Sequence, residues 1–349
     1  MPIAKISEAD LVGTEARRTS DARGAAASKR DLDLDVGRGI AILLVVYGHA
    51  LIGAIGAGLD ATVARFWVIM IYTSHMAFFF AVSAFLSAGM VGRNWPAFWR
   101  AAAQRILWPY LLWSLVLYSA HFVMSGYTNT ALAEYQPWRI LWKPPSVMWF
   151  LWYLLVALIA SRVLRRAPRG LTATIGAAAF AAAYVWEGVP SEMRFVGLFL
   201  LVAAGGADLR RWIAQPWVIA VAGAVMAAMG YLAALQAQAP IVGYPAFAPV
   251  YIAAAFAGPV FLFALSAFIA GRFDGLNATL ALSYIGQKTM AIFVMHILLT
   301  AGTRIALVAG GMTSWGGIVL LSFLAGVVVP LVFAWLAERM GIGAAMGWR

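Results

Sequence analysis

Long apolar stretches separated by short polar or basic segments dominate the hydropathy pattern of this chain. Most of them approach the length of about 20 residues that a helix needs to cross the hydrocarbon core of a membrane. The pattern predicts an all-α fold, a polytopic transmembrane helical bundle of about ten spans. The predicted spans cover residues 36–58, 66–90, 106–124, 147–163, 171–187, 195–209, 215–235, 250–270, 283–307 and 316–337.

The N-terminal segment breaks this pattern. Residues 1–35 are rich in Ala, Arg, Asp and Ser, and they contain neither an apolar period nor the hydrophobic region of a cleavable signal. We expect them to form a disordered cytoplasmic tail. Residues 36–349 then form a single transmembrane domain whose first span is an uncleaved start-transfer helix.

The charged residues are few, and they are biased toward one side of the predicted topology. Only 11% of residues are charged, and the formal net charge is +11. A basic excess can indicate nucleic-acid binding, but most Lys and Arg residues fall in loops on the same side as the N-terminal tail. The positive-inside rule therefore predicts that both termini are cytoplasmic, and we expect no nucleic-acid partner.

The four histidines of the chain all fall inside predicted spans. Ionisable side chains are costly in hydrocarbon and mark candidate functional sites. Counting the helical rise from the nearest helix end places His49, His75 and His296 at a similar depth, about 15–20 Å from the cytoplasmic face. His121 lies nearer the outer end of its helix. A purely structural role, in which each imidazole bonds to a neighbouring helix, stays open.

A metal site at this depth is not expected. The sequence contains no cysteine, which also excludes disulfides and a thiolate nucleophile. The predicted topology places no carboxylate beside the three histidines, since Asp35 lies at the inner surface and the other candidates lie outside, namely Asp60, Glu134, Glu187 and Glu192.

Arg38 and His49 share the first predicted span. They are eleven residues apart, and at about 100° per residue a helix has then completed about three turns. Both side chains therefore project from one face of the helix, about 16 Å apart along its axis. One face carries a cation near the membrane surface and a titratable group deep inside.

Four short motifs, taken in this order, resemble the acyltransferase-3 family of integral membrane acyltransferases. The motifs are the run from Asp35 through Arg38 to His49, the run from His75 to Ser83 and Leu86, the segment from Arg105 to Tyr110, and the stretch from Gly286 to His296. Two positions depart from the family pattern. Ala84 stands where the family usually has Gly, and Arg100 lies about 140° around a helix from Arg105, where the family has closer basic pairs.

The resemblance implies an acyl-CoA-dependent O-acyltransferase of the bacterial inner (plasma) membrane. Such an enzyme moves an acyl group, often acetyl, from cytosolic acyl-CoA to a hydroxyl of an extracytoplasmic sugar or glycan. The expected partners are acyl-CoA as co-substrate, a sugar or glycan acceptor and membrane lipid, without a metal. Residues 36–349 are then the acyltransferase-like domain.

Four catalytic candidates follow from this comparison. We expect His49 to act as the general base that takes the proton of the acceptor hydroxyl. The thioester carbonyl needs a hydrogen-bond donor as negative charge develops on its oxygen, and Ser83, His75 and His296 are the candidates. His75 is also a candidate carrier of a covalent acyl intermediate.

Three residues are candidates for binding the cofactor. Arg38 and Arg105 are expected to pair with the phosphates of acyl-CoA by charge-assisted hydrogen bonds. Asp35 belongs to the same motif as Arg38. The alternative interpretation of both arginines is that of ordinary positive-inside anchors.

Two other classes of function remain open at this point. A transporter or exporter of a glycan or lipid-linked sugar would use the same buried polar groups to bind its cargo. The chain shows no pair of related halves, which many transporters have. A non-catalytic membrane scaffold is the second alternative, and the spacing of Arg38 and His49 argues against it.

Overall fold

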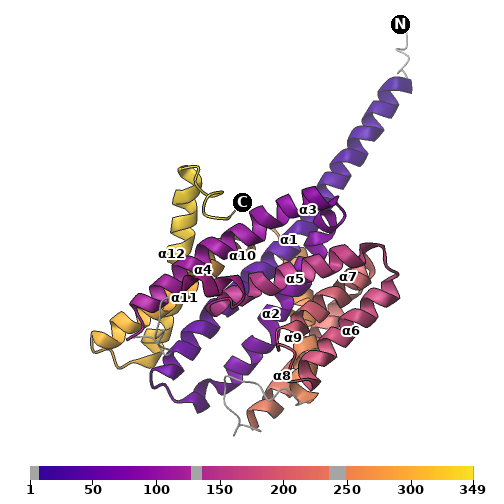
Figure 1. Cartoon of the computed structure of the whole chain (residues 1–349). Coiled ribbons are helices and arrows are strands. Elements are labelled where there is room, and N and C mark those ends of the chain that lie inside the picture. The colour runs from indigo at the N-terminus through magenta and orange to yellow at the C-terminus, as the bar shows by residue number, and fades with distance from the viewer. Residues whose placement is uncertain (1–7, 127–135, 236–248, 349) are drawn as a thin grey trace.

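The computed structural model describes residues 8–126, 136–235 and 249–348, which form a bundle of helices without a strand among them (Figure 1). The all-α class is confirmed. The α-helices are α1 (Glu8–Gly56), α2 (Ala61–Val91), α3 (Trp95–Ala102), α4 (Trp108–Val123), α5 (Trp149–Val163), α6 (Arg169–Val185), α7 (Met193–Ile213), α8 (Pro216–Leu235), α9 (Pro249–Arg272), α10 (Asn277–Gln287), α11 (Thr289–Ala309) and α12 (Trp315–Arg339).

Within the described part of the chain, seven helical segments are long and apolar enough to cross a membrane, so the polytopic membrane architecture stands. The predicted number of about ten spans is not confirmed, because among the described helices α6 and α7 do not qualify by length and composition and the apolar part of α8 is shorter. The α6 helix has 17 residues, and α7 is kinked at Gly206, whose φ is 56°. The seven segments are Leu32–Gly56, Phe66–Val91, Trp95–Val123, Pro137–Arg166, Ala255–Arg272, Thr289–Ala309 and Trp315–Arg339.

Two predicted elements differ in the structure. The segment expected to be a disordered tail is helical from Glu8 onward and continues into the first span, projecting away from the bundle (Figure 1). Its many Ala and Arg residues are good helix formers, and a helix propagates readily from a turn that already exists. The predicted single span 283–307 is also divided, because α10 ends at Gln287 and α11 begins at Thr289.

The α1 helix is the centre of the bundle. It packs against α2, α9, α10, α11 and α12. Its contact with α10 depends on two glycines, since a Cβ on Gly39 would collide with the backbone of Leu282 and a Cβ on Gly286 with the backbone of Asp35. The backbones of the two helices therefore touch at the start of the first span.

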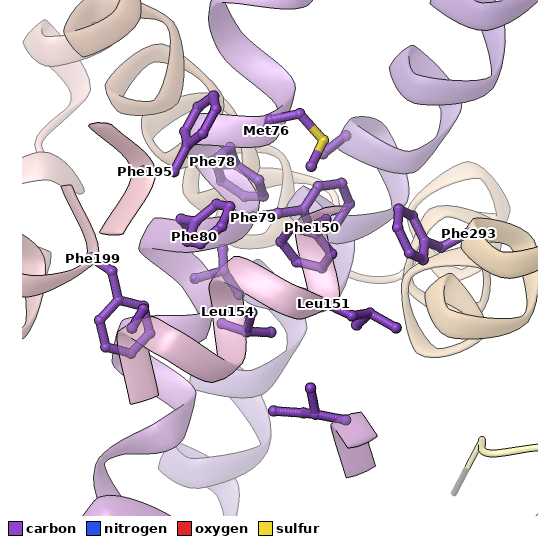
Figure 2. Close-up of a cluster of buried hydrophobic side chains, with 14 of the residues drawn as sticks. Met76, Phe78, Phe79, Phe80, Phe150, Leu151, Leu154, Phe195, Phe199 and Phe293 are labelled. Carbon is purple, nitrogen blue, oxygen red and sulfur yellow. The ribbon is translucent and has the colours of Figure 1, made fainter. Parts of the chain in front are cut away.

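Aromatic side chains hold the other helices around α1. Phe78, Phe79 and Phe80 of α2 meet Phe150 of α5, Phe195 of α7 and Phe293 of α11 in one buried cluster (Figure 2). The rings of Phe80 and Phe195 stack at 5.2 Å between centroids, and those of Phe150 and Phe293 meet edge to face at 5.3 Å. This cluster fixes four helices relative to one another.

The C-terminal segment folds back onto the start of α4. Trp108 donates a hydrogen bond from Nε1 to the carbonyl of Ala345 at 2.8 Å, and Trp113 donates one to the carbonyl of Met346 at 2.9 Å. Arg105 lies just before Trp108. The end of the chain therefore lies on the Arg105 side of the bundle.

Candidate functional site

Three of the four histidines meet between α1, α2 and α11, as their common predicted depth suggests. The rings of His49 and His296 are in contact, with centroids 5.1 Å apart. Tyr72 stands between His49 and His75, with ring centroids 6.0 Å and 5.1 Å from theirs. His75 and His296 are fully buried, whereas His49 is partly exposed. His49 is thus the histidine that a ligand reaches first.

Backbone carbonyls determine which nitrogen of His75 and His296 carries the proton. His75 Nδ1 lies 2.5 Å from the carbonyl oxygen of Ile71, and His296 Nδ1 lies 2.7 Å from that of Phe293. A carbonyl only accepts, so Nδ1 must be the donor in both rings. Nε2 of each neutral ring is then a lone-pair acceptor, and His296 Nε2 is buried without a hydrogen-bond partner among the described residues. In their neutral forms, His75 and His296 can therefore accept a hydrogen bond or a proton at Nε2, but they cannot donate from it.

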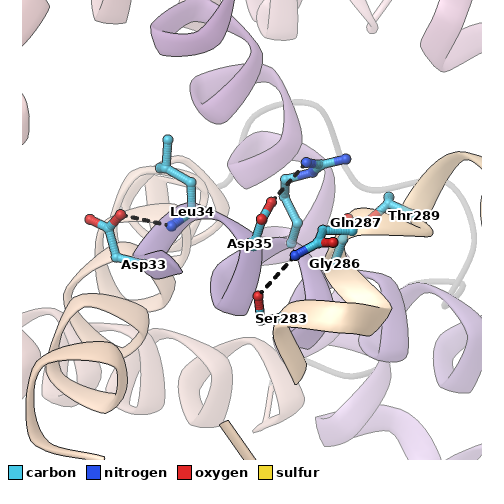
Figure 3. A network of polar contacts seen from close by, with 8 residues as sticks. Asp33, Leu34, Asp35, Ser283, Gly286, Gln287 and Thr289 are labelled. Atoms are coloured by element: carbon cyan, nitrogen blue, oxygen red, sulfur yellow. Dashed lines mark hydrogen bonds and ion pairs between the residues drawn. The ribbon is translucent and has the colours of Figure 1, made fainter. Parts of the chain in front are cut away.

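The predicted cofactor residues gather in a second place. Arg38, Ser83 and Arg105 line a cavity of about 270 Å³ together with Thr289 and Phe293. We call it the arginine cavity. Asp35 is not one of its lining residues; its carboxylate accepts a hydrogen bond from Arg38 Nη1 at 3.1 Å beside the α10–α11 junction (Figure 3). Asp35 is therefore placed to orient Arg38, while it does not itself line the arginine cavity.

A π-helical turn carries Arg105. Residues Ala103–Leu107 form this turn between α3 and α4. Such turns are rare and often occur at functional sites. The angle of about 140° between Arg100 and Arg105 assumed a regular α-helix, so it does not apply across this turn. Arg105 lines the arginine cavity, and Arg100 is exposed and does not line it.

His49 and His75 line a smaller cavity of about 170 Å³, the histidine cavity. Tyr72 and Trp149 also line this cavity, and Glu192 and Arg194 line it from the start of α7. The predicted absence of a carboxylate near the histidines is therefore wrong. Glu192 lies just before α7 and enters the site because α7 packs against α2, which no local pattern indicates.

A third cavity, of about 390 Å³, lies toward the ends of α1 and α11 that are remote from Arg38. We call it the far cavity. His49, His121 and Arg304 line it, with Ser146 and Thr300. His121 therefore shares a cavity with His49, although its position in the sequence suggested a separate place.

The cavities follow one another through shared wall residues. Phe293 lines both the arginine cavity and the histidine cavity, and His49 lines both the histidine cavity and the far cavity. The parallel helices α1 and α11 form the common wall. Of the three cavities, Ser83 lines only the arginine cavity. It is therefore separate from the histidines with which it was predicted to act. The described residues contain no cluster of three or more side chains suited to hold a metal.

Comparisons with known proteins point to one family. The family model of the acyltransferase 3 family, an acyltransferase domain, matches residues 31–339. Nodulation protein NolL of Mesorhizobium japonicum is 31% identical over 167 residues, which cover 46% of this chain and 43% of the relative. Nodulation protein NolL of Sinorhizobium fredii is 31% identical over 150 residues, which cover 40% and 38%. The matched region is thus less than half the length of each relative, and no solved structure matches the chain.

The family match and the structure cover the same part of the molecule. Residues 31–339 begin at the start of the first membrane-spanning segment and end with the last residue of α12. Several motif residues that suggested the family lie at these cavities: Arg38, Ser83 and Arg105 line the arginine cavity, His49 and His75 line the histidine cavity, and the His296 ring contacts that of His49. The chain belongs to the acyltransferase 3 family of integral membrane acyltransferases.

Proposed function

We propose that this protein transfers an acyl group, in the simplest case acetyl, from cytosolic acyl-CoA to a hydroxyl of an extracytoplasmic sugar or glycan across the bacterial inner membrane. The observation that carries the proposal is the succession of three cavities along α1 and α11, with Phe293 and His49 as the shared wall residues. A donor and an acceptor that enter from opposite faces meet at His49.

The arginine cavity suits the donor. Arg38 and Arg105 provide two cations at its wall, and the phosphates of acyl-CoA need such partners. Asp35 holds the guanidinium of Arg38 in place. The narrow pantetheine arm then extends past Phe293 toward His49, over the distance of about 16 Å that separates Arg38 and His49 along α1.

A larger basic cavity adjoins the arginine cavity. It measures about 560 Å³, shares Ser87 with the arginine cavity, and is lined by Arg165, Arg169 and Arg210. We assign the bulky nucleotide end of acyl-CoA to this space. The excess of Lys and Arg on this side favours its cytoplasmic orientation.

His49 is the general base of the proposed reaction. The acceptor oxygen attacks the thioester carbonyl carbon while its proton passes to His49. The new carbon–oxygen bond forms, the carbon–sulfur bond breaks, and the departing thiolate of CoA takes up the proton from His49. His296 Nε2, buried beside the His49 ring, stabilises the imidazolium that forms for a moment.

The thioester carbonyl oxygen needs a hydrogen-bond donor, and we look for this donor in the histidine cavity. Neutral His75 and His296 present lone pairs on Nε2, so they are poorly suited to this role. Ser83 lines a different cavity. We assign the role to the hydroxyl of Tyr72, because Tyr72 is a lining residue of the histidine cavity that carries a hydrogen-bond donor.

Calorimetry with acetyl-CoA tests the proposal without knowledge of the acceptor. The purified full chain in phosphatidylcholine nanodiscs should bind acetyl-CoA saturably, and Arg105→Gln should weaken binding by about tenfold. Arg100→Gln is the matched control, because Arg100 is exposed and does not line the arginine cavity. If folded protein binds neither acetyl-CoA nor longer acyl-CoAs, the proposal fails and a glycan transporter or a scaffold takes its place.

A further inference from the structure

Arg304 is a buried cation with no counter-ion among the residues that the structure describes. It belongs to α11, its side chain is only 8% exposed, and its Nε is enclosed without a hydrogen-bond partner. No residue in the described ranges forms an ion pair or hydrogen bond with it. A buried charge without a partner is strongly unfavourable, and most of all in a membrane-spanning segment. Such a group is expected where a ligand supplies the missing charge.

The far cavity gives that ligand a place. Arg304 lines it together with His49, His121, Ser146 and Thr300, and none of the lining residues in the described part of the chain is acidic. The wall is therefore a fixed cation, two imidazoles and two hydroxyl groups among apolar side chains. This composition favours an anion that carries hydroxyl groups.

A simpler explanation, an arginine that reaches out to the membrane surface, does not fit. Arg304 lies five residues before the end of α11, about 8 Å along the axis, so its side chain is long enough to reach the interface. Yet it is almost fully buried and turns toward α1. A Cβ on Gly53 would lie 3.2 Å from Arg304 Nε, so the glycine leaves the guanidinium room against α1.

The position of Gly53 also relates Arg304 to the proposed chemistry. Gly53 follows His49 by one helical turn, so it lies on nearly the same face of α1, about 6 Å farther along the axis. His49 and Arg304 are therefore two neighbouring points on one wall of the far cavity. Their separation along α1 is comparable to the width of one sugar ring.

We infer that Arg304 binds an acidic group, a carboxylate or a phosphate, on the acceptor glycan and so positions one of its hydroxyls at His49. This inference rests on the proposed function and names the class of acceptor: a sugar that carries a negative charge about one ring away from the acylated hydroxyl. Arg304 is a binding residue in this account, and His49 remains the base.

Matched sugars test the inference by binding alone. Wild-type protein in phosphatidylcholine nanodiscs is titrated with methyl glucoside, methyl glucuronide and glucose 1-phosphate, of which only the last two carry a charge. We expect the charged sugars to bind about ten- to a hundredfold more tightly than methyl glucoside. Arg304→Gln should abolish this preference, and Arg304→Lys should keep part of it. Arg139→Gln, at an exposed arginine outside the cavity, is the matched control and should change nothing.

Three results overturn the inference. One is equal binding of charged and neutral sugars by wild-type protein that still melts cooperatively. Another is a preference that survives in Arg304→Gln. The third concerns a lipid headgroup as the source of the anion: the charged sugars fail to bind, and nanodiscs with phosphatidylglycerol raise the melting temperature of the wild type but not of Arg304→Gln.

Acetyl-CoA binding, measured on the same samples, separates this inference from the proposed function. If acetyl-CoA binds and the sugar preference is absent, only the inference fails. If the sugar preference depends on Arg304 and acetyl-CoA does not bind, the anion site stands and the acyl transfer is refuted.

Discussion

The arginines at the two ends of the α1–α11 pair differ in whether they have a counter-ion. Arg38 at one end has an internal counter-ion, because its Nη1 lies 3.1 Å from Oδ1 of Asp35, three residues earlier on the same helix. Arg304 at the other end is less exposed to solvent and has no such partner among the described residues. A paired cation keeps its position without a ligand, whereas an unpaired buried one depends on a ligand for its charge balance. We therefore regard the Arg38 end as preorganised and the Arg304 end as completed by its substrate.

Replacement of the histidine between the two ends should have the largest effect. His49→Gln keeps the size and polarity of the side chain but removes the base. We expect acetyl transfer to fall by about a hundred- to ten-thousandfold, with acetyl-CoA binding unchanged in calorimetry. Transfer at the wild-type rate by the folded variant would refute the role of His49.

The two arginines should separate donor from acceptor. Arg38→Gln should raise the KM for acetyl-CoA by about tenfold and leave acceptor binding as it is. Arg304→Gln should raise the KM for the acceptor by about tenfold and leave the KM for acetyl-CoA as it is. Steady-state kinetics with each substrate varied in turn measure both effects. A variant that raises the KM for acetyl-CoA and the KM for the acceptor equally would contradict the assignment of Arg38 to the donor and Arg304 to the acceptor.

Loss of the counter-ion of Arg38 should have a smaller effect. Asp35→Asn keeps the shape but removes the charge that orients the guanidinium. The pair is partly exposed, so we expect only about a threefold rise in the KM for acetyl-CoA. Tighter binding of acetyl-CoA by this variant would mean that Asp35 mainly repels the phosphates.

The smallest effect is expected at Ser83. Because Ser83 lines the arginine cavity and not the histidine cavity, Ser83→Ala should change kcat by less than about twofold. A donor to the carbonyl oxygen would instead contribute about a hundred- to a thousandfold. Tyr72→Phe serves as the comparison, and a large loss in Ser83→Ala with none in Tyr72→Phe would reverse our assignment.

The sequence predicted best those features that depend on one helix. Hydropathy located the apolar helices, and helical periodicity placed Arg38 and His49 on one face of α1 because 3.6 residues per turn is a property of any α-helix. The meeting of His49 and His296 followed from their similar depth once α1 and α11 proved to be neighbours.

The features that the sequence missed depend on how helices meet. Glu192 reaches the histidine cavity through the packing of α7 over α2, and Arg304 faces α1 because Gly53 leaves space for it. Neither contact has a periodic signature. The π-helical turn at Arg105 also leaves no signal in the sequence, since the composition of its residues does not differ from that of an α-helix.

The most direct test of the central claim is an electron cryomicroscopy structure of the full chain in nanodiscs with acetyl-CoA bound. Our account predicts phosphate density beside Arg38 and Arg105, and a thioester that passes Phe293 and ends next to His49. Acetyl-CoA bound in the far cavity beside Arg304, or with its thioester remote from His49, would contradict it.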